Sequence, residues 1–226
     1  MRCWCGKGND TSVKTVGVCV RKDRVSPASS TGVLLNNAGF DYNVTRDRQS
    51  AIIMFCHQLN LSVMINANNP DDVLSGQNVT LDSRDIYLFS PYLVTNGRFS
   101  SLTDWQQKAV KCFNKTIELG IKVACQATSN STIAATFNMT DLFSQAWYGT
   151  AMYNFDYFQA TDIDLSGMTN VVYYFPNLNM NYGTTWQTPN VQTNALSTHY
   201  YRQTDTNTLH VFGDGLAYGN GTLTQP

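Results

Sequence analysis

The sequence contains little charge and almost no glutamate. Asp, Glu, Lys and Arg make up 14% of the 226 residues, whereas typical soluble domains have roughly 25%. Glu118 is the only glutamate, and the polar character comes instead from 22 Asn, 25 Thr and 16 Ser. These residue types favour turns and strands over exposed helix faces. The composition therefore predicts a mainly β fold with many polar loops.

Long hydrophobic runs and familiar catalytic motifs are also missing. No stretch of about 18 apolar residues is present, so we expect no membrane-spanning helix. The first residues lack the apolar segment of a signal peptide, so we expect a chain made without one or one whose signal was removed. No P-loop, His-Glu-x-x-His, Gly-x-Ser-x-Gly or dinucleotide-binding pattern occurs. We predict no catalytic, cofactor-binding or metal-binding residues, and a protein that is not an enzyme.

The net charge of −1 divides unevenly along the chain. Residues 1–125 hold 14 Lys and Arg and ten acids, which gives +4, and residues 126–226 hold Arg202 and six Asp, which gives −5. If the two halves interleave in the fold, these charges cancel locally. If they separate, the molecule is bipolar and packs head to tail with copies of itself. The overall balance predicts no nucleic-acid partner.

The order of apolar and polar residues predicts one domain, residues 1–226, with about ten short strands. Alternation or short apolar runs predict strands, whereas helices are expected from Thr103 to Gly120, with Thr103 as the cap, and from Asp141 to about Tyr153. The runs at residues 51–56 and 61–65 are expected to form a hairpin. The fold class is predicted as a β sandwich or jelly roll with one or two helices, with an α+β arrangement as the alternative. The expected strands are residues 16–20, 32–35, 51–56, 61–65, 86–89, 171–175, 199–202 and 209–212.

Cysteines and acidic residues leave two metal hypotheses open. Cys3, Cys5 and Cys19 with a distant histidine could bind zinc, although Cys-x-Cys alone is a weak pattern. The acidic stretch that follows Asn154 could supply oxygens to calcium, or it is a solvated loop. The remaining cysteines are either buried thiols or bridges. The residues concerned are Asn154, Asp156, Asp162 and Asp164 for calcium, and Cys19, Cys56, Cys112 and Cys125 for the buried thiols or bridges.

The N-glycosylation pattern occurs eight times, where about four matches are expected by chance from the Asn, Ser and Thr content. Asn114 lies inside the expected helix beside its apolar stripe, where a glycan would be awkward. The alternative is an Asn- and Thr-rich protein made in a cell that does not glycosylate. The seven predicted glycosylation sites are Asn9, Asn43, Asn60, Asn78, Asn130, Asn138 and Asn220.

The string from Phe212 to Asn220 (FGDGLAYGN) resembles the first sequence block of GDSL-type esterases and lipases. In that family a serine follows the Gly-Asp pair and is the nucleophile. The matching position here is Gly215, which has no hydroxyl, so acyl transfer through it is impossible. We predict no hydrolysis of short-chain acyl esters, and the alternative interpretation is a Gly-rich turn after a strand.

Aromatic residues crowd the second half of the chain and are the best surface candidates. Tyr and Trp combine an apolar ring with a polar tip and favour protein interfaces and sugar stacking alike. The leading hypothesis is a structural protein of a virus or phage particle, which contacts copies of itself or other particle proteins. The alternative is a secreted or viral-surface glycoprotein domain that binds a host receptor or glycan, so the protein is expected in a virion or outside the cell. The predicted binding surface comprises Trp147, Tyr148, Tyr153, Tyr157, Trp186, Tyr200 and Tyr201.

Overall fold

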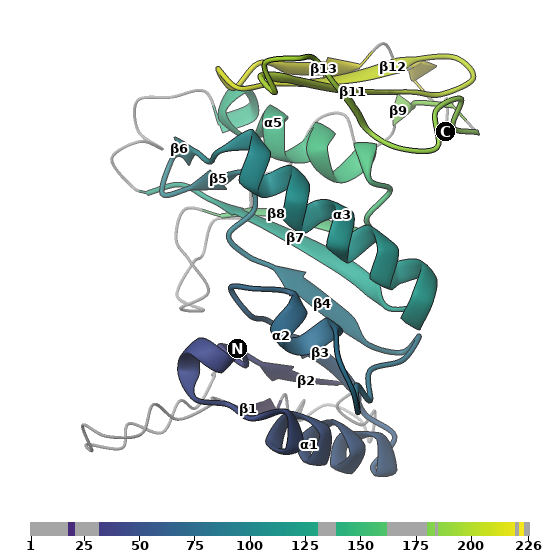
Figure 1. Ribbon diagram of the computed structural model, residues 1–226. Coiled ribbons are helices and arrows are strands. Elements are labelled where there is room, and N and C mark those ends of the chain that lie inside the picture. Colours follow the sequence, from purple (N-terminus) through teal and green to yellow (C-terminus); the bar gives the residue numbers. More distant parts are fainter. Residues whose placement is uncertain are drawn as a thin grey trace. The chain divides into compact units, whose positions relative to one another are not determined.

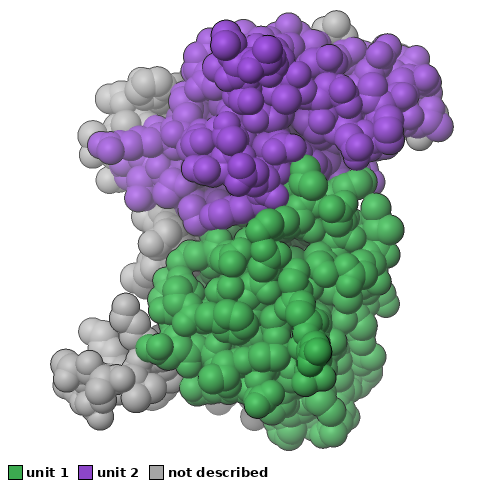
Figure 2. Space-filling view, viewed as in Figure 1, with its two compact units in different colours: residues 1–90, 110–124 green, residues 91–109, 125–226 purple. Residues whose placement is uncertain are grey.

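The computed structural model describes residues 18–20, 32–130, 139–161, 180–183, 185–219 and 222–223. The chain divides into two compact units, which are coloured separately in Figure 2. Unit 1 comprises residues 1–90 and 110–124, and unit 2 comprises residues 91–109 and 125–226. The expected strand at residues 171–175 lies outside the described residues.

The main sheet is largely parallel, so the prediction of a β sandwich or jelly roll is wrong. Its strand order is β1 (Val18–Val20), β2 (Gly32–Leu35), β3 (Ser62–Ile65), β4 (Ile86–Phe89), β7 (Lys122–Thr128) and β8 (Tyr157–Thr161). Only β1 runs antiparallel, and the five strands from β2 to β8 form a parallel sheet. Four α-helices occur in the described residues, so the fold is of the α/β kind, and the α+β alternative fits it.

Helix α1 (Arg46–Gln58) replaces one strand of the expected hairpin (Figure 1). The Thr45 hydroxyl accepts the backbone N–H of Arg48 and caps the helix. Gln49, Ile53 and Cys56 are buried, a spacing of four and three residues that fits one helix face. The apolar run at residues 51–56 misled the prediction because Met54 and Phe55 are 51% and 61% exposed. Strand β3 follows the helix and pairs with β2 in parallel, as a crossover connection allows.

Helix α3 (Leu102–Leu119) confirms the expected helix but not its cap. Thr103 lies inside the helix, and the Ser101 hydroxyl accepts the backbone N–H of Asp104 instead. The predicted stripe is only half correct, since Trp105 is 3% exposed but Ile117 is 72% exposed. Gly120 ends the helix at φ +71°, a conformation that glycine adopts at little cost. Helix α2 (Asp71–Leu74) and the turn η1 (Phe40–Tyr42) complete the helical elements of unit 1.

Unit 2 places helix α5 (Met139–Met152) against a four-stranded antiparallel sheet (Figure 1). The sheet order is β10 (Gln192–Thr193), β11 (His199–Gln203), β12 (Thr208–Phe212) and β13 (Ala217–Gly219). Two smaller pairs are β5 (Val94–Thr95) with β6 (Arg98–Phe99), and β9 (Met180–Asn181) with β14 (Thr222–Leu223). The expected helix at residues 141–153 and the strands at 199–202 and 209–212 are thus confirmed.

The core of unit 2 is built largely from aromatic rings. Trp105 makes edge-to-face contacts with Tyr92, Tyr153 and Tyr200, with ring centroids 6.3, 5.6 and 5.6 Å apart. Gly149 allows α5 to approach this cluster, since a Cβ there would lie 2.6 Å from Cδ1 of Leu93. The helix therefore needs glycine at this position despite its low helix propensity.

Candidate functional site

The structure separates the predicted surface aromatics into core and surface residues. Tyr148, Tyr153 and Tyr200 are only 5%, 3% and 2% exposed, so their assignment to a binding surface is wrong. Trp147 is half-buried and packs against the ring of Phe158. These residues build unit 2 because their large rings exclude water from its core.

Trp186 has a structural contact of its own. Its ring is half-buried, and the guanidinium of Arg202 lies 3.9 Å from the ring centroid. Arg202 is 4% exposed and donates hydrogen bonds to the backbone carbonyls of Met152, Thr188 and Pro189 at 2.8, 3.3 and 3.0 Å. Burial lowers the pKa of this guanidinium, although the neighbouring Tyr153 opposes the shift. Arg202, the one Lys or Arg among residues 126–226, therefore binds backbone carbonyls inside unit 2.

Of the predicted aromatics, Tyr157 is exposed, and Tyr201 is half-buried like Trp147 and Trp186. Tyr157 on β8 is 47% exposed, and Tyr201 on β11 is half-buried. Tyr201 belongs to a larger group of rings that lies on the side of the β10–β13 sheet opposite the buried Tyr200 and Val211. We call this group the aromatic face. It consists of His199, Tyr201, His210, Phe212 and Tyr218.

Strand pairing brings the aromatic face together. Tyr201 lies opposite His210, and His210 lies opposite Tyr218, so these three rings form a row across β11, β12 and β13. His199 lies opposite Phe212 in the adjacent row. Alternate residues of a strand point to opposite sides, which is why Tyr200 is core and Tyr201 is surface. None of the residues that the described strands place on this side is charged at neutral pH.

The rings of the aromatic face lie close to parallel. His199 and Phe212 stack with centroids 4.1 Å apart and an interplanar angle of 1°. His210 and Tyr218 follow at 4.7 Å and 32°, and His199 and Tyr201 at 5.3 Å and 31°. The faces of His199 and Phe212 that meet are therefore covered by each other, while the other two pairs are tilted.

His199 and His210 form a hydrogen-bonded pair within this face. Nε2 of His199 lies 3.0 Å from Nδ1 of His210. Burial lowers the pKa of both imidazoles, and the proximity of His199 lowers that of His210 further. The sequence places these histidines 11 residues apart, and only the β11–β12 register brings them together.

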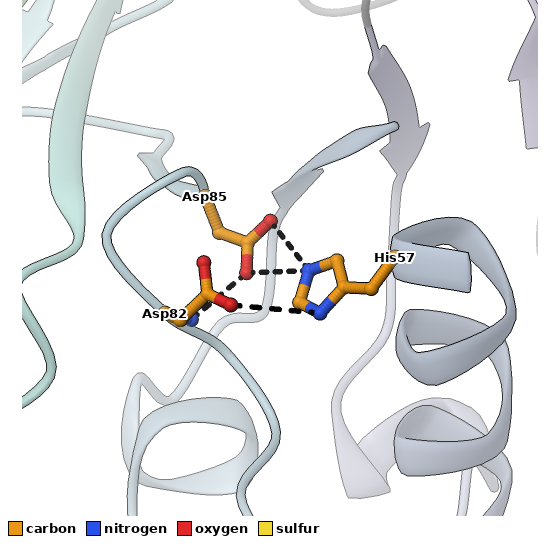
Figure 3. A group of neighbouring side chains, drawn as sticks. All are labelled: His57, Asp82 and Asp85. Carbon is orange, nitrogen blue, oxygen red and sulfur yellow. Dashed lines mark hydrogen bonds and ion pairs between the residues drawn. The ribbon is translucent and has the colours of Figure 1, made fainter. Parts of the chain in front are cut away.

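A second polar group lies in unit 1, where His57 at the end of α1 meets Asp82 and Asp85 before β4 (Figure 3). Nε2 of His57 lies 3.0 and 2.9 Å from the two oxygens of Asp85, and Nδ1 lies 3.7 Å from Asp82. Burial on its own would raise the pKa of Asp82, but hydrogen bonds from Arg84 and the charges of His57 and Arg84 outweigh it and lower the pKa. One ligand atom from each residue lies within 4.8 Å of the others, close enough to surround a metal ion.

The hydrogen bonds of Asp85 show a structural role for this group. Asp85 is 0% exposed, and its oxygens also accept the backbone N–H groups of Val63 and Asp82 at 2.8 and 2.9 Å. The carboxylate thus links α1, β3 and the segment before β4. Because a carboxylate has about four acceptor positions, a metal ion would have to displace bonds that hold these elements together. No local spacing pattern signals this group, since His57 and Asp85 are 28 residues apart.

The predicted glycosylation sites differ in accessibility. Asn43, Asn60 and Asn78 are exposed and adopt left-handed φ angles of 58°, 56° and 59° in turns. Asn130 is half-buried, and its side chain donates to the carbonyl of Asn96. Asn114, which we expected beside a buried stripe, is exposed on α3. Asn9, Asn138 and Asn220 lie outside the described residues, and glycosylation stays a prediction at all seven sites.

The remaining sequence hypotheses fall on turns and buried positions. Gly215 lies in the β12–β13 turn at φ +95°, next to the ring of Phe99, so the GDSL-like string is a Gly-rich turn. Cys56, Cys112 and Cys125 are buried thiols that form no disulfide. Asn154 and Asp156 lie between α5 and β8, but Asp162 and Asp164 lie outside the described residues, as do Cys3 and Cys5. Cys19 lies in β1.

The positive charge of the N-terminal half does not fall on the described part of that half. Residues 32–130 contain eight Lys and Arg and eight acids, a net charge of zero, whereas residues 1–31 contain six basic and two acidic residues. The described residues from 139 to 223 contain four Asp and Arg202, a net charge of −3. Head-to-tail packing by opposite charges therefore stays a prediction that depends on residues 1–31.

No model of a known protein family matches the chain, and no curated protein matches it. Among the described residues, no helix combines the length and the apolar character needed to cross a bilayer.

Proposed function

We propose that the chain is a non-enzymatic structural protein that associates with a second copy of itself through the aromatic face. The observation that carries this proposal is a sheet face of five rings without a charged side chain. The charged residues among the described residues after 138 are four Asp and one Arg, and all of them lie outside this face. Tyr and aromatic residues are enriched in protein interfaces, whereas charged residues are depleted at interface centres.

Charge complementarity favours a second copy as the partner. A basic partner would be attracted to the aspartates and not to this neutral face, while an acidic partner would be repelled by them. A second copy supplies an uncharged face of the same composition, so rings can be buried without leaving a charge unpaired. Contact between identical faces is isologous and closes as a two-fold dimer, and packed sheets of this kind lie about 10 Å apart.

The arrangement of the rings favours a protein partner over a glycan. Sugar stacking requires open ring faces, but the faces of His199 and Phe212 cover each other at a centroid distance of 4.1 Å. The tyrosine hydroxyl groups and the imidazoles of this face are groups that suit hydrogen bonds with another polypeptide. Tyr218, at 41% exposed, is the most accessible ring of the group and is the best site for a disruptive substitution.

Sedimentation equilibrium of the full chain at neutral pH tests the proposal. We expect a monomer–dimer equilibrium with a dissociation constant of about 1 mM or lower. A Kd of about 1 mM corresponds to a binding free energy of about 4 kcal/mol, and a weaker contact would not support the proposal. Tyr218→Lys places a charge on the aromatic face and should shift the equilibrium to monomer. Tyr157→Lys is the matched control because Tyr157 is similarly exposed, at 47%, but lies on β8.

Three outcomes overturn the proposal. The wild-type chain could remain monomeric, the two lysine variants could associate equally, or the monomer could bind a neutral oligosaccharide in a manner lost with Tyr218→Lys. The last result would support the glycan-binding alternative. Membership of a virus or phage particle is a further prediction, which purification of particles that contain the chain would support.

A further inference from the structure

We infer that the His199–His210 pair is an acid-sensitive switch that releases the contact made by the aromatic face. This inference rests on the proposed function for its consequence, because the dimer is what the switch would release. The pairing itself rests on the geometry of β11 and β12 and is tested separately below.

The two imidazoles meet edge to edge. Their planes differ by 18°, their centroids are 5.2 Å apart, and the facing nitrogens are separated by only 3.0 Å. A contact of this kind is a hydrogen bond in which one ring donates its N–H to the unprotonated nitrogen of the other. It couples the tautomers of the two rings, because only one of the two facing nitrogens carries a proton.

Protonation changes this contact in two distinct steps. A first proton can bind at a nitrogen that points away from the partner ring, so the hydrogen bond is kept. A second proton must occupy the last free nitrogen between the rings. Both facing nitrogens then carry hydrogen, the hydrogen bond is lost, and two positive charges lie side by side. The two steps therefore belong to the pair and not to either histidine alone.

Among the described residues, the strands β10 to β13 place no carboxylate beside these charges on the same side of the sheet. On the same side of the sheet, β11 supplies Tyr201, β13 supplies Tyr218, and β10 supplies Gln192, none of which is acidic. Arg202 lies on the opposite side of β11, where it binds backbone carbonyls. Asp205 and Asp214 accept backbone N–H groups in turns at the ends of β11 and β12.

In the proposed dimer, the imidazoles of the two copies would lie at one interface, and acidification would give both copies a positive charge there. Each copy would change its face from neutral to a charge of up to +2, and like charges across an interface oppose association. The change falls below the ordinary histidine pKa of 6.5, because burial lowers the pKa of both rings.

The same shift predicts how stability depends on pH. Since the folded state binds protons more weakly than the unfolded state, which titrates near pH 6.5, the unfolded state takes up more protons as pH falls. The contribution of the neutral pair to stability is complete above about pH 6.5 and is lost as pH falls through and below that value.

NMR titration of the imidazole resonances in the full-length chain tests the pair without reference to association. The wild-type chain, recorded at concentrations above and below the onset of association, should show two coupled steps below pH 6.5 in both cases, with the second displaced to lower pH. His199→Asn should leave His210 with a single step closer to 6.5, and His210→Gln is the reciprocal variant. Independent titration of the two rings with similar midpoints would overturn the inference.

Sedimentation at pH 7.5 and pH 5 tests the consequence. We expect the dimer dissociation constant to rise at least tenfold at pH 5, since one unit of pKa difference between free and associated states corresponds to a tenfold change. His210→Gln should reduce this dependence, whereas Gln203→Ala, on the same side of β11, should leave it unchanged. Coupled titration with a pH-independent dimer would overturn the switch but not the proposed function, and a monomer at both pH values would overturn the proposed function.

Discussion

Replacement of Trp105 by alanine tests whether the aromatic core holds unit 2 together. The Trp105 side chain is 3% exposed and contacts three other aromatic rings at centroid distances of 5.6–6.3 Å. Removal of a fully buried Trp typically costs roughly 3–5 kcal/mol, because burial is lost and a cavity remains. Edge-to-face ring pairs contribute about 0.5–1.5 kcal/mol each beyond their burial, so we expect the upper part of this range.

The assay is thermal unfolding followed by far-ultraviolet circular dichroism. For a chain of this length, each kcal/mol shifts the Tm by roughly 2–4 °C, so Trp105→Ala should lower the Tm by roughly 6–20 °C. Phe55→Ala is the control, since Phe55 is 61% exposed on α1 and its loss should change stability by about 0.5 kcal/mol or less. A Tm for Trp105→Ala within about 2 °C of the wild type would refute the assignment of Trp105 to the core.

Two further predictions concern a helix cap and a buried charge. Ser101→Ala should lower the free energy of unfolding by about 1 kcal/mol, while Thr103→Ala should change it by about 0.5 kcal/mol or less. Urea unfolding measures both. A larger loss for Thr103→Ala than for Ser101→Ala would identify Thr103 as the cap of α3. Arg202→Met should cost roughly 2–5 kcal/mol because the carbonyls of Met152, Thr188 and Pro189 lose their donor. Arg202→Lys should rescue little of this loss, since a single ammonium group cannot reproduce the planar array of donors. If either variant unfolded at the same urea concentration as the wild type, the structural role of Arg202 would be contradicted.

Local sequence patterns predicted individual elements better than their assembly. Strands β2, β3, β4, β11 and β12 and helices α3 and α5 were all expected from their residues. The apolar run at residues 51–56 was wrongly assigned to a strand because Met54 and Phe55 are exposed and obscure the helical spacing of Gln49, Ile53 and Cys56. Because the prediction did not include α1, it placed no crossover helix between β2 and β3. Parallel strands need such a connection, so the parallel sheet could not be recognised from the sequence.

The candidate site was predicted only in part. Tyr201 was expected on the surface, and its place in an alternating strand could also have assigned Tyr200 to the core. His199, His210 and Tyr218 were missed because their proximity depends on the register of β11 with β12 and of β12 with β13. No local pattern encodes that register, since each histidine interacts across the sheet with residues at least eight positions away. The same applies to His57 and Asp85, which are joined only in the folded unit.

An NMR dilution series tests most directly whether the aromatic face is the contact between copies. Spectra of the full-length chain would be recorded at neutral pH over a hundredfold range of concentration. The account predicts concentration-dependent shifts of the His199, Tyr201, His210 and Tyr218 ring resonances, with Tyr157 and His57 unchanged. Shifts confined to residues outside the aromatic face, or no shifts at any concentration, would contradict it.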